Sequence, residues 1–125
     1  MNQGLKEINE LTGVWGSLLC NNQAGVIASA PPADLIGSAL ENIARHCVDL
    51  MSPGNESFQD LQEVVVHFQQ KKLFILDLEQ AILIVLCNPG VDISLLRMTI
   101  NLMITRWEAD QKIQKQLKAN FVERI

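Results

Sequence analysis

The stretch that most constrains the fold is Ala81–Cys87, AILIVLC, in which no residue has a polar side chain. A short apolar run bounded by turn residues is typical of a strand that is buried on both faces. The turn residues Asn88-Pro89-Gly90 end the run, since proline cannot donate a ladder hydrogen bond. The chain therefore needs further strands on both sides of this one and helices over both faces of the sheet.

Four further segments, each lying between turn residues, are predicted to be strands: residues 14–21, 26–30, 61–68 and 73–77. The links around the last two of these are short, so strands 61–68, 73–77 and 81–87 are expected to be antiparallel neighbours. Alternation along the first strand predicts two apolar faces. One face carries Val14, Leu18 and Cys20, and the other carries Trp15 and Leu19.

The segment 61–68 differs from the other strands because polar residues interrupt its valines. Gln62, Glu63 and His67 are typical of a strand at the edge of a sheet. An exposed edge that is rich in valine pairs readily with another chain. This edge is therefore a candidate for contact with a second protein.

Apolar residues at steps of three and four predict helices over residues 3–12, 35–51 and 93–123. The middle helix has a second apolar strip beside its main stripe, so its apolar surface is wider than contact with one sheet requires. A continuous last helix would run about 45 Å, whereas a strand of seven residues covers about 23 Å. Its second half is therefore expected to overhang the domain and to pack on a second chain.

The order helix, two strands, helix, three strands, helix resembles the roadblock/dynein light chain family. The resemblance begins with LTGVWGSLLCNNQAGVIAS, where a small-residue strand, a polar hairpin with Gly25 and an apolar strand follow the first helix. It continues with the long helix after Pro32 and with LFILDLEQAILIVLCNPGVDISLLRMTI, a strand pair that leads to the final helix. The resemblance covers about residues 3–107. We therefore expect a roadblock-like domain over 1–107 and a basic helical extension of the last helix over 108–125.

The resemblance implies an α+β fold with a five-stranded antiparallel sheet. The middle helix covers one face, and the N- and C-terminal helices cover the other. Family members form dimers in which the third strands pair edge to edge and the middle helices pack together, which agrees with the valine-rich edge and the wide apolar surface described above. The dimer interface implied for this chain contains Leu35, Ala39, Asn42, His46, Leu61, Val64, Val65, Val66 and His67.

Some family members are dynein light chains, and others are scaffolds or activating partners of small Ras-like GTPases in bacteria and in eukaryotic membrane-signalling complexes. The resemblance implies a non-enzymatic homodimer of the prokaryotic regulator type that binds a Ras-like GTPase through its paired middle helices. Residues 111–125 contain four Lys or Arg against Glu123 alone, so this basic tail could contribute to the contact. The partner-binding residues expected are Ser38, Glu41, Asn42, Arg45, Asp49, Lys112 and Lys115.

Two other functions stay open at this point. An assembly adaptor, such as a subunit of a motor or another multi-subunit complex, would bind its partner regardless of nucleotide. A small-molecule sensor would need a cavity with convergent polar groups, but the sheet-facing positions are almost all apolar.

The residues that could carry chemistry do not form a reactive pattern. The sequence has no G-x-x-x-x-G-K-[ST] phosphate loop, and its two histidines lack metal-site spacing, so we expect no enzyme activity, no metal and no cofactor. Arg45 could serve as an arginine finger, but a helix arginine paired with Glu41 or Asp49 is the simpler interpretation. Arg97 and Arg106 are interpreted in the same way, and Trp15 and Trp107 as packing residues.

Composition restricts the environment and the partners. The 125 residues carry a formal net charge of −4, which disfavours binding to nucleic acid. Three cysteines without close spacing argue against a disulfide framework. The first residues lack a long apolar stretch, so no signal peptide is expected, and no uncharged apolar run approaches about 18 residues, so direct membrane insertion is not expected. A cytoplasmic protein with reduced thiols is the resulting expectation.

Overall fold

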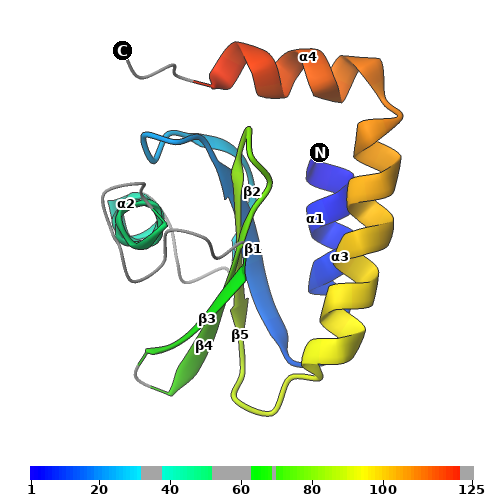
Figure 1. Cartoon of the computed structure of the whole chain (residues 1–125). Coiled ribbons are helices and arrows are strands. Elements are labelled where there is room, and N and C mark those ends of the chain that lie inside the picture. Colours follow the sequence, from blue (N-terminus) through cyan, green and yellow to red (C-terminus); the bar gives the residue numbers. More distant parts are fainter. Residues whose placement is uncertain (32–37, 52–62, 69, 122–125) are drawn as a thin grey trace.

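The computed structural model describes residues 1–31, 38–51, 63–68 and 70–121. The elements of this part follow the expected order, except that a further helix, α4, follows α3 (Figure 1). They are α1 (Asn2–Asn9), β1 (Val14–Cys20), β2 (Val26–Ala30), α2 (Ser38–Leu50), β3 (Glu63–Phe68), β4 (Lys71–Asp77), β5 (Ile82–Cys87), α3 (Ile93–Glu108) and α4 (Gln111–Asn120).

The five strands form one antiparallel sheet in the order β2-β1-β5-β4-β3. The apolar run at 81–87 lies in the middle, and every residue of β5 is buried, as the sequence predicts. β3 is an edge strand that pairs only with β4 within the described chain, which confirms the assignment of this segment to the edge. The expected α+β fold is therefore confirmed.

Helices cover both faces of the sheet in the predicted arrangement. α2 lies on one face, and α1 and α3 lie side by side on the other (Figure 1). The alternation of β5 divides the core between the two faces. Leu83 and Val85 pack with Leu5, Met103 and Trp107 on the α1–α3 face, whereas Ile82, Ile84 and Leu86 pack with Leu40, Ala44 and Cys47 below α2.

The alternation predicted for the first strand is wrong at its beginning. Leu18 and Cys20 face α2 and Leu19 faces α1, as expected. However, Val14 packs with the α1–α3 core, and Trp15 packs with the α2 core. The pairing with β5 is irregular between Val14 and Gly16, and a bulge at this place shifts the alternation by one residue.

The single helix predicted over 93–123 is also wrong, because α3 ends at Glu108 and α4 begins at Gln111. The Asp110 carboxylate caps the new helix by accepting hydrogen bonds from the backbone N–H groups of Lys112 (2.9 Å) and Ile113 (3.2 Å). The chain turns here, and α4 crosses the end of the sheet instead of overhanging it (Figure 1). Leu117 is consequently 5% exposed within this chain and needs no second chain to cover it.

Two turns differ in detail from the expectation. α1 ends at Asn9, before the predicted boundary at 12, and Gly13 adopts a φ of 92° just before β1. In the β1–β2 turn, Ala24 and not the neighbouring Gly25 takes the left-handed conformation (φ 66°). The Asn21 side chain holds this turn by accepting hydrogen bonds from the N–H groups of Gln23 and Gly25.

Candidate interaction surfaces

The outer surface of α2 contains the largest group of residues proposed for binding. The residues of α2 expected to contact a second subunit or another partner are all exposed: Ser38, Ala39, Glu41, Asn42, Arg45, His46 and Asp49. The opposite side of the helix buries Leu40, Ala44, Cys47 and Val48 in the core. The 3.6-residue period therefore separates a packing face from a free face. Leu35 lies outside the described residues.

The free face of α2 has two different sides. Ala39, Ile43, His46 and Leu50 recur at steps of three and four, which places them on one stripe along the helix. Ile43 and Leu50 are half-buried within this chain, so the stripe is largely apolar and only partly covered. The other side carries Glu41 and Arg45 and remains in water. The first side suits contact with another helix, and the second suits a polar partner.

Arg45 lacks the intrahelical ion pair expected from the sequence. Within the described residues the ion pairs are Arg97–Glu63 and Arg106–Glu7, and neither involves α2. Arg45 is exposed, and both Glu41 and Asp49 belong to the described helix. Its guanidinium is therefore available to a carboxylate or phosphate of another molecule.

The two arginines of α3 hold neighbouring elements instead of pairing along their own helix. Arg97 donates three hydrogen bonds to the Glu63 carboxylate of β3, with the shortest at 2.6 Å. Arg106 pairs with Glu7 of α1. These hydrogen bonds raise the pKa of both guanidinium groups, and the Arg106 bond lowers the pKa of Glu7. Both arginines thus fasten α3 to its neighbours, which corrects their interpretation as helix-paired residues.

The edge strand β3 contributes further candidate residues. Val64 is buried and Val66 packs against the α2 core, whereas Val65 is 36% exposed and His67 is exposed. The backbone edge away from β4 has no partner strand within the described chain. Leu61 lies outside the described residues. The structure therefore presents an available edge together with an exposed valine.

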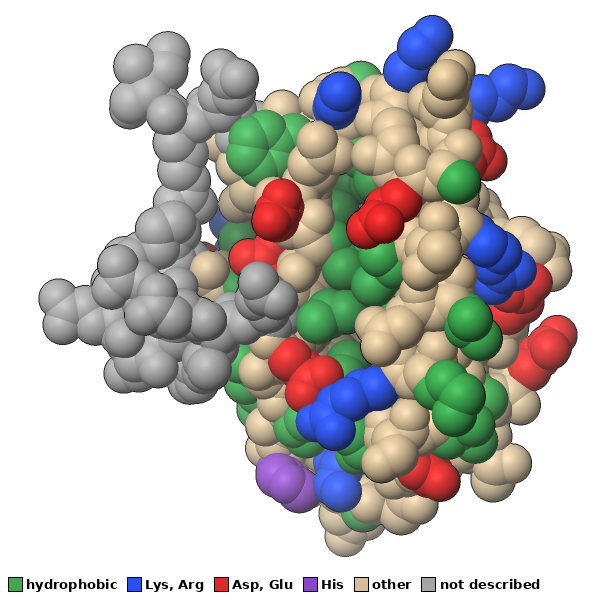
Figure 2. All heavy atoms as spheres, turned by 45° about the vertical axis from the view of Figure 1, so that its right-hand side comes forward, with side chains coloured by type: hydrophobic (Ala, Val, Ile, Leu, Met, Phe, Trp, Pro, Cys, Tyr) green, Lys and Arg blue, Asp and Glu red, His purple; other side chains and the backbone are tan. Residues whose placement is uncertain are grey.

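Lys112 and Lys115 are exposed on α4, but they do not extend the α2 surface. The first half of α4 adjoins the end of α3, across the sheet from α2 (Figure 1). Figure 2 shows Lys and Arg side chains gathered at this end of the molecule. The expected partner-binding residues thus divide into two separate places on one protomer.

The residues that could react are inaccessible in the folded chain. Cys20, Cys47 and Cys87 are free and buried, and burial raises their pKa values to about 12, 12 and 11. Cys20 and Cys87 lie at opposite ends of the paired strands β1 and β5, so these two thiols cannot form a disulfide. No group of three possible metal-ligating side chains occurs in the described part of the chain. Among the described residues, no helix is long and apolar enough to cross a membrane.

The tryptophans have structural partners. Trp107 is 6% exposed in the core formed by α1, α3 and α4. Trp15 packs beside the α2 core, and the Lys71 ammonium lies 4.4 Å from the centre of its ring. The same ammonium donates a hydrogen bond to the Asn88 side chain (3.0 Å). Both tryptophans are thus packing residues, as the sequence predicts.

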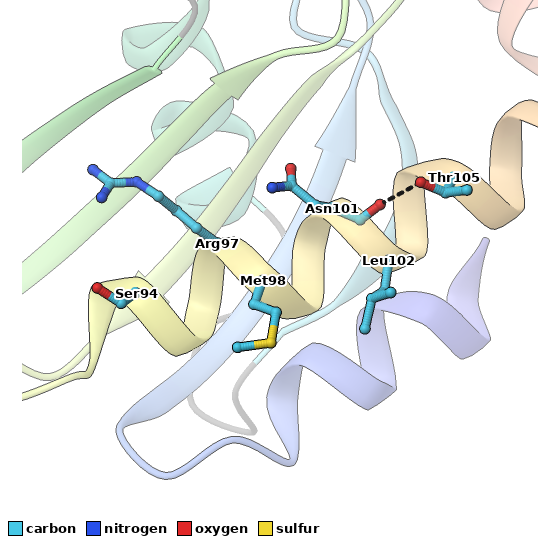
Figure 3. Close-up of a pocket in the computed structure, with 6 residues that line it drawn as sticks. All are labelled: Ser94, Arg97, Met98, Asn101, Leu102 and Thr105. Atoms are coloured by element: carbon cyan, nitrogen blue, oxygen red, sulfur yellow. Dashed lines mark hydrogen bonds between the residues drawn. The ribbon is translucent and has the colours of Figure 1, made fainter.

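A surface on α3 was missed at the level of sequence. Leu95, Met98 and Leu102 are 43%, 58% and 62% exposed, and they follow one another at steps of three and four. Hydrophobic side chains are visible on this side of the molecule (Figure 2). A shallow hollow runs along the outside of α3 between Met98 and Leu102 on one side and Arg97 and Asn101 on the other (Figure 3). The signal was present, because α3 has a second apolar stripe beside the one that enters the core.

Comparison with solved structures defines the fold. A roadblock/LC7 domain from Streptomyces avermitilis superposes with a TM-score of 0.73 at 16% identity, covering 87% of this chain and 95% of that one. Myxococcus xanthus MglB gives a TM-score of 0.73 at 13% identity, covering 98% and 90%. The gliding protein MglB from Thermus thermophilus gives 0.65 at 14%, covering 94% and 87%.

The chain therefore has the roadblock/LC7 fold, as its element order predicts. No family model and no curated protein sequence matches it. At these identities the superposition establishes the architecture alone, and function must be inferred from the surfaces described above.

Proposed function

We propose that this chain is a non-enzymatic regulator or scaffold that forms a homodimer and binds a Ras-like small GTPase through α2. The observation that carries the proposal is the free face of α2, which combines a partly covered apolar stripe with an exposed Arg45 that has no ion pair among the described residues. The roadblock fold, shared with the MglB proteins, supports it. The buried thiols are consistent with a role in binding.

Dimerisation would use the apolar side of α2 and the β3 edge. In a two-fold contact the stripe of Ala39, Ile43, His46 and Leu50 on one protomer meets the same stripe on its partner, because such interfaces are isologous. Pairing of two β3 edges would satisfy backbone groups that have no strand partner within the described chain. One of the similar structures, an MglB, is described in a tetrameric arrangement, which supports self-association of this fold.

His46→Glu tests the dimer, because it places two carboxylates near each other across the two-fold axis. We expect the variant to lose this contact, and His46→Gln to retain it. The measurement is sedimentation velocity over a range of protein concentrations. Equal association of the two variants would exclude the α2 stripe as the dimer contact.

The GTPase contact would use the polar side of α2. Arg45 can bind a carboxylate or phosphate in bidentate geometry, and Glu41, one turn away, can bind a cation. Lys112 and Lys115 could contact the partner only from another direction, since they lie across the sheet from α2. Any effect on hydrolysis would come from ordering the catalytic groups of the GTPase.

The test is capture of partners from lysate of the source organism, with GTP analogue and GDP in parallel. We expect a small GTPase to be enriched with one nucleotide only. The double variant Arg45→Glu with Glu41→Lys should lose this partner while keeping its own association state. The double variant Lys6→Glu with Glu10→Lys makes the same exchange of charge at two exposed positions, one in α1 and one directly after it, and should bind normally. A partner retained equally with both nucleotides would identify an assembly adaptor instead.

A further inference from the structure

We propose that the exposed apolar stripe on α3 is a second self-association surface, on which α3 of another copy packs antiparallel. The stripe consists of Leu95, Met98 and Leu102, the most exposed large apolar side chains of this helix. It lies on the sheet face opposite α2, so it is separate from the dimer contact proposed above. The inference does not depend on the proposed function.

The spacing of the stripe makes it complementary to itself. Leu95 and Leu102 are seven residues apart, with Met98 near the midpoint. A two-fold axis beside Met98 therefore brings Leu95 of one copy opposite Leu102 of the other, while the two Met98 side chains meet at the centre. This arrangement repeats the heptad contact of antiparallel helix pairs. The hollow between the two rows of side chains on α3 can receive side chains from the facing helix (Figure 3).

The charges beside the stripe fit the same arrangement. The antiparallel register places Asp92 at the height of Arg106 of the second copy, on the same flank of the stripe. Asp92 is exposed, and the Arg106 side chain retains 59% of its exposure despite its contact with Glu7. The other flank carries the uncharged Ser94, Asn101 and Thr105 together with Arg97, whose charge is balanced by Glu63. Arg106 would then lie between Glu7 of its own copy and Asp92 of the other, and the two helix dipoles oppose each other.

Polar and membrane ligands fit the stripe less well. The three apolar side chains of the stripe and their few charged neighbours provide neither a cluster of cations for an anionic membrane nor an enclosed cavity for a small molecule. A helix pair of this length buries less than the roughly 800 Å² per partner of a standard interface, so the association should be weak and dependent on concentration. Combined with a second two-fold contact through α2, it would produce a tetramer or an open chain.

A variant with charged residues in the stripe tests the proposal through the molar mass of its assemblies. In Met98→Glu combined with Leu102→Glu, four carboxylates would meet in the contact. We expect this variant to lose one association step, so that the largest species seen by sedimentation velocity falls from a tetramer or open chain to the assembly held by the α2 contact alone. Gln111→Glu combined with Gln116→Glu adds the same charge at exposed positions of α4 and should associate like the wild type. Unchanged mass of the α3 variant at all concentrations would overturn the proposal.

A cysteine at the two-fold axis provides a second, independent test. The native thiols are buried, so Met98→Cys introduces an accessible thiol without competition. Interaxial distances of about 8–10 Å bring facing helix positions into disulfide range. We expect mild oxidation to cross-link Met98→Cys into covalent pairs, and Lys115→Cys, an exposed control on α4, to cross-link far less.

Association through α3 can be tested separately from the proposed α2 dimer. In a His46→Glu background, which removes the α2 contact, Met98→Cys should still cross-link through α3. Loss of cross-linking in that background, or equal cross-linking of the α4 control, would show that α3 does not mediate the association. Thermal unfolding of each variant verifies that it is folded before its mass is compared.

Discussion

α2 and α3 lie on opposite faces of one sheet, and their outer surfaces differ in how their charges are paired. α2 exposes charged and polar side chains beside its partly covered apolar stripe, and its Arg45 has no ion pair within the described residues. α3 exposes an apolar stripe, and its two arginines bind β3 and α1. The charges of α3 thus stabilise the domain itself, whereas the charges of α2 remain available to another molecule.

The two faces also differ in how completely the described chain covers them. α1, α3 and α4 close over one face and bury Trp107 between them. α2 covers the other face, where Trp15 stays half-buried under Lys71. We infer that the three-helix face is the rigid frame and that the α2 face adapts to a partner. This difference in packing between the two faces can be tested by substitutions on each of them.

Replacing each tryptophan by alanine should give the largest difference in stability between the two faces. Trp107→Ala removes a large side chain that three helices enclose, and we expect it to lower the free energy of unfolding by about 3–5 kcal/mol. Trp15→Ala removes a partly exposed ring, so its cost should be clearly smaller. Chemical denaturation at a fixed protein concentration measures both. Equal costs would mean that the α2 face is packed as tightly as the other.

The cap of α4 should have an intermediate effect. Asp110→Ala removes the acceptor for two backbone N–H groups at the start of α4, and we expect a loss of about 0.5–2 kcal/mol. Hydrogen exchange should become faster in 111–120 while β5 stays protected. Asp92→Ala, which removes the corresponding cap of α3, is the matched comparison. If exchange rose equally in α4 and β5, α4 would be part of the cooperative core and not a separately released cover.

The ion pair between α1 and α3 should have the smallest effect, which depends on pH. Arg106 lowers the pKa of the Glu7 carboxyl below its usual value near 4.5. A lowered pKa means that the stabilisation is complete above the unfolded value and is lost as the pH falls through the folded value. Both groups are solvent-exposed, so the change in melting temperature should be slight.

Arg106→Gln should remove this dependence on pH and return the Glu7 titration, followed by NMR, toward the usual value. Arg97→Gln serves as the control, because it breaks the Glu63 pair and leaves Glu7 unchanged. A Glu7 titration that does not respond to Arg106→Gln would show that the contact is not maintained in solution.

Much of the fold was predictable because its signals are local. The uninterrupted apolar run at 81–87 required a central strand, and short links required antiparallel neighbours. The polar residues in 61–68 identified the edge strand. The residues proposed on α2 come from the family resemblance, and every described one of them is exposed. Whether they bind a partner remains a prediction.

The order of elements, the central position of β5 and the two sides of α2 could be predicted from the sequence, because each follows from the period of apolar residues along one segment. The contacts between distant segments became visible in the tertiary structure alone. The bulge at the start of β1, the turn at Asp110 and the pairing of Arg97 with Glu63 and Arg106 with Glu7 depend on neighbours far along the chain. The exposure of Leu95, Met98 and Leu102 belongs to the same group, since a period assigns residues to a face but cannot say which faces the rest of the chain will cover.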